Sequence, residues 1–392
     1  MMYEKEVKEK VTHILPKVVI WRRHFHEYPE LSGQEVKTSE YIQQVFKELG
    51  IPYETGFFQN AVLGTIKGKY PGKTVALRAD MDALPVTELT GLPFASKNKG
   101  VMHACGHDGH MSILLGAAAV LNKMKEKLHG TVKIVFQPAE EEAAIGGGRH
   151  IAGSGKLDDV SEIYGLHVWP ELPTGKVGLK PGALMAASDR FYVHIKGKST
   201  HAAQPHNGTD ALVAAAHFII DVQSLISREM NPMDNVVCTI GLMNAGTRYN
   251  VGVEDSYLEG TCRTYRPELR DKMEKRLGEI LEGLDAMFHT HSKLNYVRGH
   301  SATINTPEKI AFLQDVGKAY LGEDHICQPE FPSMCAEDFS SYLEKFPGAF
   351  MWLGTGDGNT PALHNASFAI NESILPLGVT MEAAAALEAL AR

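Results

Sequence analysis

Short apolar runs alternate with helix-type patterns through residues 1–180, and this alternation limits the fold more than any other feature. Apolar residues recur at helical spacing over residues 3–27 and 36–49, and strand-type runs follow at 61–67 and 74–78. A helix pattern at 111–124 then precedes strand-type runs at 131–136 and 162–168. Continuous apolar strands that alternate with helices are typical of a sheet buried on both faces. The pattern predicts an α/β fold with a mostly parallel sheet.

The pattern changes near Pro181. The following segments read strand, helix, strand, strand, helix, strand, at residues 190–196, 210–226, 235–242, 251–263, 267–289 and 293–298. This is the βαββαβ order of a ferredoxin-like layer. Helix patterns at 307–320 and 373–391 around a strand at 348–353 then resume the first style. We therefore expect an α+β domain of residues 185–299 inserted into a domain formed by residues 1–184 and 300–392.

Composition excludes several classes of protein. A length of 392 residues has room for two or three domains. The net charge of −8 provides no positive field for a polyanion, so we expect no nucleic-acid partner. The apolar runs are shorter than the roughly 20 residues that span a bilayer, so no membrane partner is expected. The charged first ten residues lack the features of a secretory signal, and five scattered cysteines favour reduced thiols, so we expect a cytoplasmic location.

The strongest chemical signal lies in residues 103–110, which contain three of the eighteen histidines together with a thiol and a carboxylate. Cys105 and His107, two positions apart, can bind one divalent ion. They precede a helix expected to start near Met111, and a helix N-terminus favours the thiolate. A Cys–His nucleophilic pair and a purely structural turn are the alternatives. We favour metal binding over both.

Carboxylates follow two of the expected strands. Asp80 and Asp82 face the same way if the extended chain continues, although taken alone they are better explained as turn or cap residues. Glu140 and Glu141 point in different directions, so one can bind a metal while the other accepts a proton from water. An acidic helix start explains this pair equally well.

Two isolated histidines, His167 and His364, stand near the ends of other apolar segments. Each alone is typical of an ordinary structural residue. Because the carboxyl ends of parallel strands meet at one edge of a sheet, they can join Cys105, His107 and Glu141. Five protein ligands are enough for two metals that share a bridge, whereas a structural zinc needs four.

Six segments of the chain resemble the M20 metallopeptidases, in particular the amidohydrolase branch (subfamily D) that contains hippurate hydrolase, indole-acetyl-amino-acid hydrolases and N-acetyl-diaminopimelate deacetylase. These segments are residues 23–32, 77–85, 102–108, 136–141, 165–169 and 363–365. They span nearly the whole chain and occur in the family's order. The resemblance therefore outweighs the interpretation of any single motif.

The resemblance implies a site with two divalent metal ions, manganese or zinc, with cobalt or nickel as alternatives. The implied ligands are Cys105, His107, Glu141, His167 and His364. Glu140 is implied to be the general base that takes a proton from the attacking water. Asp80 stands where other branches have the histidine of a His-x-Asp motif, so we expect Cys105 and His107 to replace that ligand and the thiolate to bridge the metals. Asp82 is then expected to orient the ligands without touching metal.

The inserted domain is implied to act as a lid and a dimerisation domain. Residues 197–206 resemble the family's lid segment, in which His201 is expected to reach the active site of the partner subunit and to hydrogen-bond the developing oxyanion. Thr200 departs from the glycine that many relatives have there. Asn250 and Arg263 are also family-like, and Arg263 can pair with a substrate carboxylate or form an ordinary surface ion pair. Residues 337–339 match a further family segment.

The activity implied is hydrolysis of the amide bond of small N-acyl amino acids, such as acetyl or benzoyl derivatives, by a homodimer. A di- or tripeptidase of the same family is the nearest alternative. A metal-free acyl hydrolase that depends on Cys105 and a catalytically silent ligand-binding homologue are more distant ones. The presence of every expected ligand and of Glu140 argues against a silent homologue. Pocket residues lie on variable loops, so the acyl group and the amino acid stay undetermined.

Overall fold

The structure is a computed structural model that describes residues 3–392, and these residues form two compact units. The larger unit contains the chain up to Leu184 together with Ile304–Phe331 and Asp338–Arg392. The smaller unit contains Met185–Thr303 and Pro332–Glu337. Residues 300–303 and 332–337, which the sequence pattern places with the first domain, thus belong to the smaller unit.

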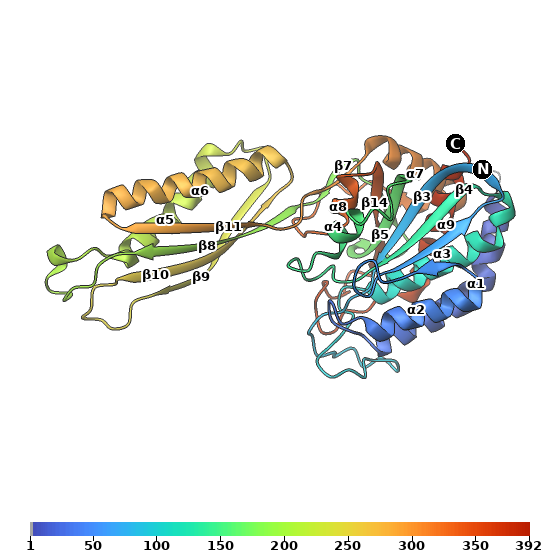
Figure 1. Ribbon diagram of the computed structural model, residues 1–392, viewed down its shortest axis with the longest axis horizontal. Coiled ribbons are helices and arrows are strands. Elements are labelled where there is room, and N and C mark those ends of the chain that lie inside the picture. Colours follow the sequence, from blue (N-terminus) through green and yellow to red (C-terminus); the bar gives the residue numbers. More distant parts are fainter. Residues whose placement is uncertain (1–2) are drawn as a thin grey trace. The chain divides into compact units, whose positions relative to one another are not determined.

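An eight-stranded sheet forms the centre of the larger unit (Figure 1). Its strands are β1 Tyr53–Glu54, β2 Val62–Lys67, β3 Tyr70–Asp80, β4 His129–Gln137, β5 Val160–Pro173, β6 Val177–Gly178, β13 Ile326–Cys327 and β14 Gly348–Gly356. Their spatial order is β1-β2-β4-β3-β5-β14-β6-β13. The four strands β4, β3, β5 and β14 run parallel, and antiparallel pairs occur on both sides of them. The carboxyl ends of these parallel strands therefore meet at one edge of the sheet.

Helices cover this sheet. They are α1 Glu4–Glu27, α2 Val36–Leu49, α3 His107–Lys123, α4 Gly147–Ala152, α7 Pro307–Tyr320, α8 Ser340–Leu343 and α9 Leu375–Leu390, with short 3₁₀ turns η1 Lys125–Lys127, η4 Glu323–His325 and η5 Glu372–Ile374. At the two points where the chain passes from one unit to the other, the strands β7 Gly182–Met185 and β12 Thr303–Asn305 form a separate two-stranded sheet. Helices α1, α3 and α9 pack together, and Gly116 allows their close approach, because a Cβ there would lie 2.7 Å from Val379 and 2.8 Å from Val18. The apolar residues of these helices and of the central strands form one core.

The smaller unit has the βαββαβ order that the sequence predicts. Its elements are β8 Ala187–Lys196, η2 Pro205–Asn207, α5 Ala211–Ser224, the π-helical turn η3 Leu225–Glu229, β9 Val236–Ala245, β10 Asp255–Thr264, α6 Pro267–Phe288 and β11 His291–Arg298. The strands pair antiparallel in the order β11-β8-β10-β9, and α5 and α6 cover one face of this sheet (Figure 1). The expected fold class, an α/β domain with a mostly parallel sheet and an inserted ferredoxin-like layer, is confirmed.

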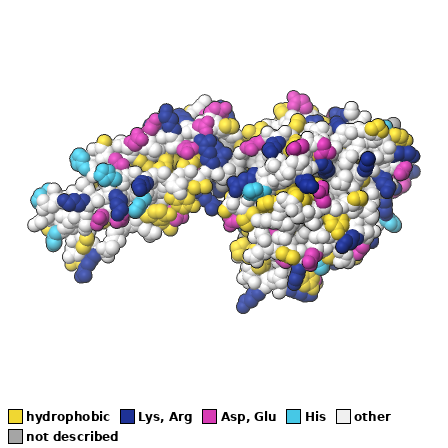
Figure 2. All heavy atoms as spheres, viewed as in Figure 1, with side chains coloured by type: hydrophobic (Ala, Val, Ile, Leu, Met, Phe, Trp, Pro, Cys, Tyr) yellow, Lys and Arg dark blue, Asp and Glu magenta, His cyan; other side chains and the backbone are white. Residues whose placement is uncertain are grey.

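Two helical stretches, 211–229 and 372–390, are long and apolar enough to cross a membrane by composition. The second is mostly buried and belongs to the core of the larger unit. The first buries Ala214, Phe218 and Val222 in the core of the smaller unit. Packing inside the protein therefore accounts for most of the apolar character of the second stretch and for part of that of the first. On the face shown in Figure 2, basic and acidic side chains are interspersed over both units.

Candidate active site

Cys105 lies in the turn immediately before α3, and His107 is the first residue of that helix. Gly106 between them has a φ of 89°, and a Cβ there would lie 2.4 Å from Cγ2 of Val168, so this position requires glycine. Helix α3 begins at His107, and the expectation of a start near Met111 is wrong. The turn therefore lies directly against β5, with its two ligand-type side chains on either side of Gly106.

The other candidate residues come from the carboxyl edge of the sheet. Asp80 is the last residue of β3, and Glu140 and Glu141 lie in the loop after β4. No helix starts at residues 140–142, so the structure excludes the acidic helix start. His167 lies inside β5, opposite Trp352 of β14, because β5 continues to Pro173. The pairing of β5 with β3 ends at Gly165. Strand β3 therefore does not cover His167, and this residue faces the site.

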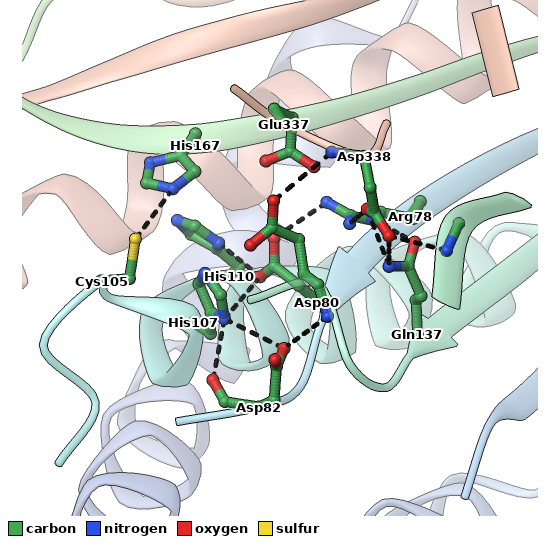
Figure 3. A network of polar contacts seen from close by, with 12 residues as sticks. Arg78, Asp80, Asp82, Cys105, His107, His110, Gln137, His167, Glu337 and Asp338 are labelled. Atoms are coloured by element: carbon green, nitrogen blue, oxygen red, sulfur yellow. Dashed lines mark hydrogen bonds and ion pairs between the residues drawn. The ribbon is translucent and has the colours of Figure 1, made fainter. Parts of the chain in front are cut away.

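The structure brings all five expected metal ligands together in the larger unit. Donor atoms of Cys105, His107 and His167 lie within 4.8 Å of one another, and so do those of Cys105, Glu141 and His364. Sγ of Cys105 is 3.4 Å from Nε2 of His167 (Figure 3). Oε1 of Glu141 is 3.3 Å from Nε2 of His364 and 3.9 Å from Nε2 of His107. Cys105 is the residue that the two groups share.

Unpartnered atoms show that these residues fit divalent metal ions. The carbonyl oxygen of Asp82 accepts from Nδ1 of His107 at 2.8 Å, so Nε2 is the nitrogen of this ring that can bind a metal. Nε2 of His107 is buried without a hydrogen-bond partner in residues 3–392, and Oε1 of Glu141, also buried, has only its close contacts with the imidazoles of His364 and His107. The carbonyl oxygen of Val168 accepts from Nδ1 of His167 at 2.6 Å, which directs its Nε2 to Cys105. Sulfur, imidazole and carboxylate donors of this kind are the ligands of zinc and similar ions.

The electrostatics of the site also favour a bound cation. Burial lowers the pKa of His107, but the carboxylates of Asp80, Asp82 and Glu141 raise it to about 10. Burial raises the pKa of the Cys105 thiol well above its usual range, and the carboxylates of Glu141 and Glu140 add to this effect. The expectation that the helix N-terminus favours the thiolate is therefore outweighed by burial and by negative neighbours. A divalent cation reverses this balance, because it stabilises the thiolate and the neutral imidazole.

Two residues beside the site have left-handed backbone conformations that side chains other than glycine rarely adopt. His364 has a φ of 66°, and its N–H donates to the carbonyl oxygen of Ala104 at 2.8 Å. Ala139, immediately before Glu140, has a φ of 57°. Such residues cost about 1–3 kcal/mol each and persist where the surroundings impose them. His364 is also the most open of the five ligand residues, with 52% of its side chain exposed.

Asp80 faces the site but has other partners. Its Oδ1 accepts from Nδ1 of His110 at 2.7 Å, and its Oδ2 pairs with Arg78 at 2.8 Å. Nε2 of His110 accepts from the N–H of Val168 at 2.9 Å, next to His167. Although burial acts in the opposite direction, His107, the hydrogen bond from His110 and the charge of Arg78 hold the pKa of Asp80 well below its usual range. His110, whose role sequence reasoning missed, is recognisable by its spacing of three residues from His107 on the helix.

Asp82 and Asp338 hold the loop that carries the expected base. Oδ1 of Asp82 accepts from the N–H of Glu140 at 3.1 Å, and its Oδ2 accepts from the N–H of Glu141 at 2.9 Å. Oε1 of Glu140 accepts from the N–H of Asp338 at 3.4 Å. The Asp338 carboxylate in turn accepts from Arg78 at 2.6 Å (Figure 3). Sequence reasoning missed these contacts of Arg78 and Asp338, although residues 337–339 resemble a family segment.

The remaining candidates belong to the smaller unit. His201 is exposed, and its Nδ1 accepts from the N–H of Ala203 at 3.1 Å. The carbonyl oxygen of Asn250 accepts from Ala202 at 3.1 Å, so the structure brings His201 and Asn250 together. Oδ1 of Asn250 is buried and has no partner in the described part of the chain. Arg263 is half-buried near the other end of β10, where burial lowers its pKa.

Comparison with known proteins agrees with this geometry. The chain is 40% identical over 354 residues to the N-acetyl-L-cysteine deacetylase of Bacillus subtilis (strain 168), covering 90% of this chain and 83% of the relative. It is 36% identical over 307 residues to the N-acyl-L-amino acid amidohydrolase of Geobacillus stearothermophilus, covering 78% of this chain and 83% of the relative.

A solved structure of the YXEP protein of Bacillus subtilis, a dinuclear metal binding peptidase from the M20 family, matches with a TM-score of 0.86 and 35% identity. The match covers 97% of this chain and 99% of that one. Residues 76–388 match the family model of Peptidase family M20/M25/M40. These findings confirm the resemblance seen in the six sequence segments. The chain belongs to Peptidase family M20/M25/M40.

Proposed function

We propose that this protein is a metal-dependent amidohydrolase that cleaves N-acyl amino acids to a carboxylic acid and a free amino acid. The observation that carries this proposal is the pair of donor groups that share Cys105, with Glu140 held beside them. The names of the two curated relatives support acetyl and other acyl derivatives of amino acids as the substrate class.

Two divalent ions are proposed to occupy the site. Their ligands are Cys105, His107, Glu141, His167 and His364. Cys105 occurs in both of these donor groups, so its thiolate would be within reach of either ion. Thiolate and imidazole suit zinc, and the carboxylate also suits manganese, with cobalt or nickel as alternatives. When bound, the two ions polarise the amide carbonyl and make water more acidic.

Glu140 is proposed to be the general base. It accepts a proton from the attacking water and then delivers this proton to the nitrogen of the leaving amino acid, so that proton transfer balances over the reaction. Its position in the loop between Asp82 and Asp338 supports this role, because contacts on both sides fix its direction. Asp82 holds the backbone of both Glu140 and Glu141 and so keeps the base and the ligand apart.

The smaller unit is proposed to serve as lid and dimerisation domain of a cytoplasmic homodimer. His201 would donate to the developing oxyanion in the active site of the partner subunit, which its exposure allows. Oδ1 of Asn250 is buried without a protein donor in the described residues, and a substrate N–H is proposed to supply one when the lid closes. Arg263, whose burial favours a charged partner, is proposed to pair with the substrate carboxylate.

An activity screen tests this function. The purified protein is loaded with manganese or zinc and incubated with acetyl- and benzoyl-amino acids and with dipeptides, and the released amine is measured. We expect hydrolysis of the acyl amino acids that a chelator abolishes. Faster hydrolysis of dipeptides would assign the chain to the peptidases instead. Activity that survives the chelator would point to Cys105 as a nucleophile.

A further inference from the structure

Two buried carboxylates hold three consecutive backbone N–H groups in the loop after β4. The N–H of Ala139 donates to Oε1 of Glu35 at 2.9 Å. The next two N–H groups, of Glu140 and Glu141, donate to the carboxylate of Asp82 at 3.1 and 2.9 Å. Asp82 is part of the site described above, whereas no role has been given to Glu35. The loop is therefore fixed at its start by a residue 104 positions earlier in the chain.

The first of these N–H groups belongs to Ala139, the residue with the strained backbone. Ala139 is fully buried and has a φ of 57°, a conformation that costs an alanine energy. Its N–H belongs to the peptide that joins it to Pro138, so the bond to Glu35 fixes the entry of the chain into this strained residue, immediately before Glu140. A hydrogen bond to a buried carboxylate is a strong, directional way to maintain such a conformation. Glu35 therefore holds the N-terminal side of Ala139, and Asp82 holds the next peptide through the N–H of Glu140.

Glu35 itself is fully buried at the start of α2. Its carboxylate accepts from the N–H of Gly33 at 2.8 Å, from Nδ2 of Asn60 at 3.1 Å and from Ala139. These three donors are uncharged groups. Burial of a carboxylate without a positive partner is costly, so simple packing is a poor explanation for this residue.

The turn that carries Glu35 also contacts Asp82. Oγ of Ser32 donates to Oδ2 of Asp82 at 2.6 Å, and the carbonyl oxygen of Glu30 accepts from the N–H of Ala83 at 2.8 Å. Residues 30–35 thus hold both the segment after β3 that carries Asp82 and the loop that carries Glu140. This gives a structural meaning to the sequence segment at residues 23–32, which the proposed function leaves without one.

We propose that Glu35 is a positioning residue for the hydrolysis, which holds the N–H of Ala139 so that the next residue, Glu140, keeps its direction. This inference rests on the proposed function of Glu140. Glu35 acts through the length and acceptor capacity of its side chain, and it reaches neither substrate nor metal. A displacement of a catalytic group by about 1 Å can cost about 100-fold in rate.

Two substitutions separate the effect of the length of the Glu35 side chain from the effect of its charge. Glu35→Gln keeps the length and one acceptor oxygen for Ala139, and the Asn60 amide can rotate to accept from the new Nε2. Glu35→Asp keeps the charge, but its shorter side chain cannot reach Ala139. We expect kcat to fall about 100-fold in E35D, with KM and metal content within about threefold, and E35Q to keep kcat within about fivefold.

A matched control lies on the same turn. Oε2 of Glu30 accepts from the N–H and Oγ1 of Thr38 at 2.8 and 2.9 Å, at the start of α2. Glu30→Asp should therefore lower Tm while leaving kcat within about threefold. Equal losses of kcat in E30D and E35D, or a larger loss in E35Q than in E35D, would overturn the positioning role.

Hydrogen exchange gives a readout that does not depend on activity. The amides of residues 139–141 should exchange at least about tenfold faster in E35D than in the wild type, and at the wild-type rate in E30D. Unchanged exchange in E35D would reject the proposal. If the wild type hydrolyses no N-acyl amino acid, the proposed function fails, and the exchange rates still decide whether Glu35 fixes the loop.

Discussion

Sγ of Cys105 lies 3.4 Å from Nε2 of His167, although 62 positions separate the two residues in the chain. The contact exists because Gly106 lets the turn before α3 lie directly on Val168 of β5. The carbonyl oxygen of Val168 also fixes the ring of His167 through its Nδ1. One close approach of backbone to strand thus brings a thiol and an imidazole to the same point.

Gly106→Ala tests this approach. The added Cβ would lie 2.4 Å from Val168, at a position that also requires a φ of 89°. We expect a loss of about 3 kcal/mol in the free energy of unfolding and a lower metal content. Gly100→Ala is the control, since it has a φ of 80° and no atom within 4 Å of the new Cβ. Denaturant unfolding should show only about 1 kcal/mol of loss there, and equal losses would contradict the packing argument.

Cys105→Ala tests the shared ligand. Both donor groups include this residue, so its loss should weaken the binding of both ions by about 100-fold or more. Metal analysis after dialysis should then find less than one ion per chain. Cys238→Ala removes another buried thiol, in the smaller unit, and should keep the wild-type content. Two ions retained in C105A would exclude a bridging thiolate.

Metal binding should depend on pH. The pKa of His107 is about 10 without metal, and that of the Cys105 thiol is also raised, so both are protonated at pH 7.5. Binding requires the unprotonated forms and must release these protons, so apparent affinity rises with pH up to the raised pKa values. Calorimetry in buffers of different ionisation enthalpy measures the number released. We expect about two protons, and a value near zero would contradict the assigned ligands.

Mixed dimers test whether the active sites are shared. His201→Ala and Glu140→Gln should each be inactive as homodimers. If His201 acts in the partner's site, each mixed dimer has one intact site, so random mixing should restore about a quarter of wild-type activity. Mixed dimers that are shown to form but stay inactive would place His201 in the site of its own chain.

The sequence predicts most elements of the fold because apolar periodicity reports burial directly. It also identifies Cys105 and Glu141, since ligand-type side chains directly after apolar runs are visible locally. The start of α3 is missed because Asp108 looks like a loop residue, yet it is buried against Arg22 at 2.9 Å and His26 at 2.8 Å. Because these partners lie far from Asp108 in the chain, the sequence around Asp108 does not indicate that it is buried.

The hydrogen bonds that hold the loop after β4 could not be predicted from the sequence for the same reason, because their partners lie far apart in the chain. Arg78 and Asp338 are 260 positions apart, and Glu35 and Ala139 are 104 apart. Each of these side chains alone resembles an ordinary charged or turn residue. Their roles follow only from the tertiary structure, which brings them into one buried hydrogen-bond network.

The most direct test of the account is the turnover of an N-acetyl amino acid by Glu140→Gln with its metal content measured in the same sample. The account predicts two ions per chain, as in the wild type, and a kcat lower by about 10²–10⁴-fold. A variant that binds two ions and keeps kcat within about tenfold of the wild type would contradict the assignment of Glu140 as the base.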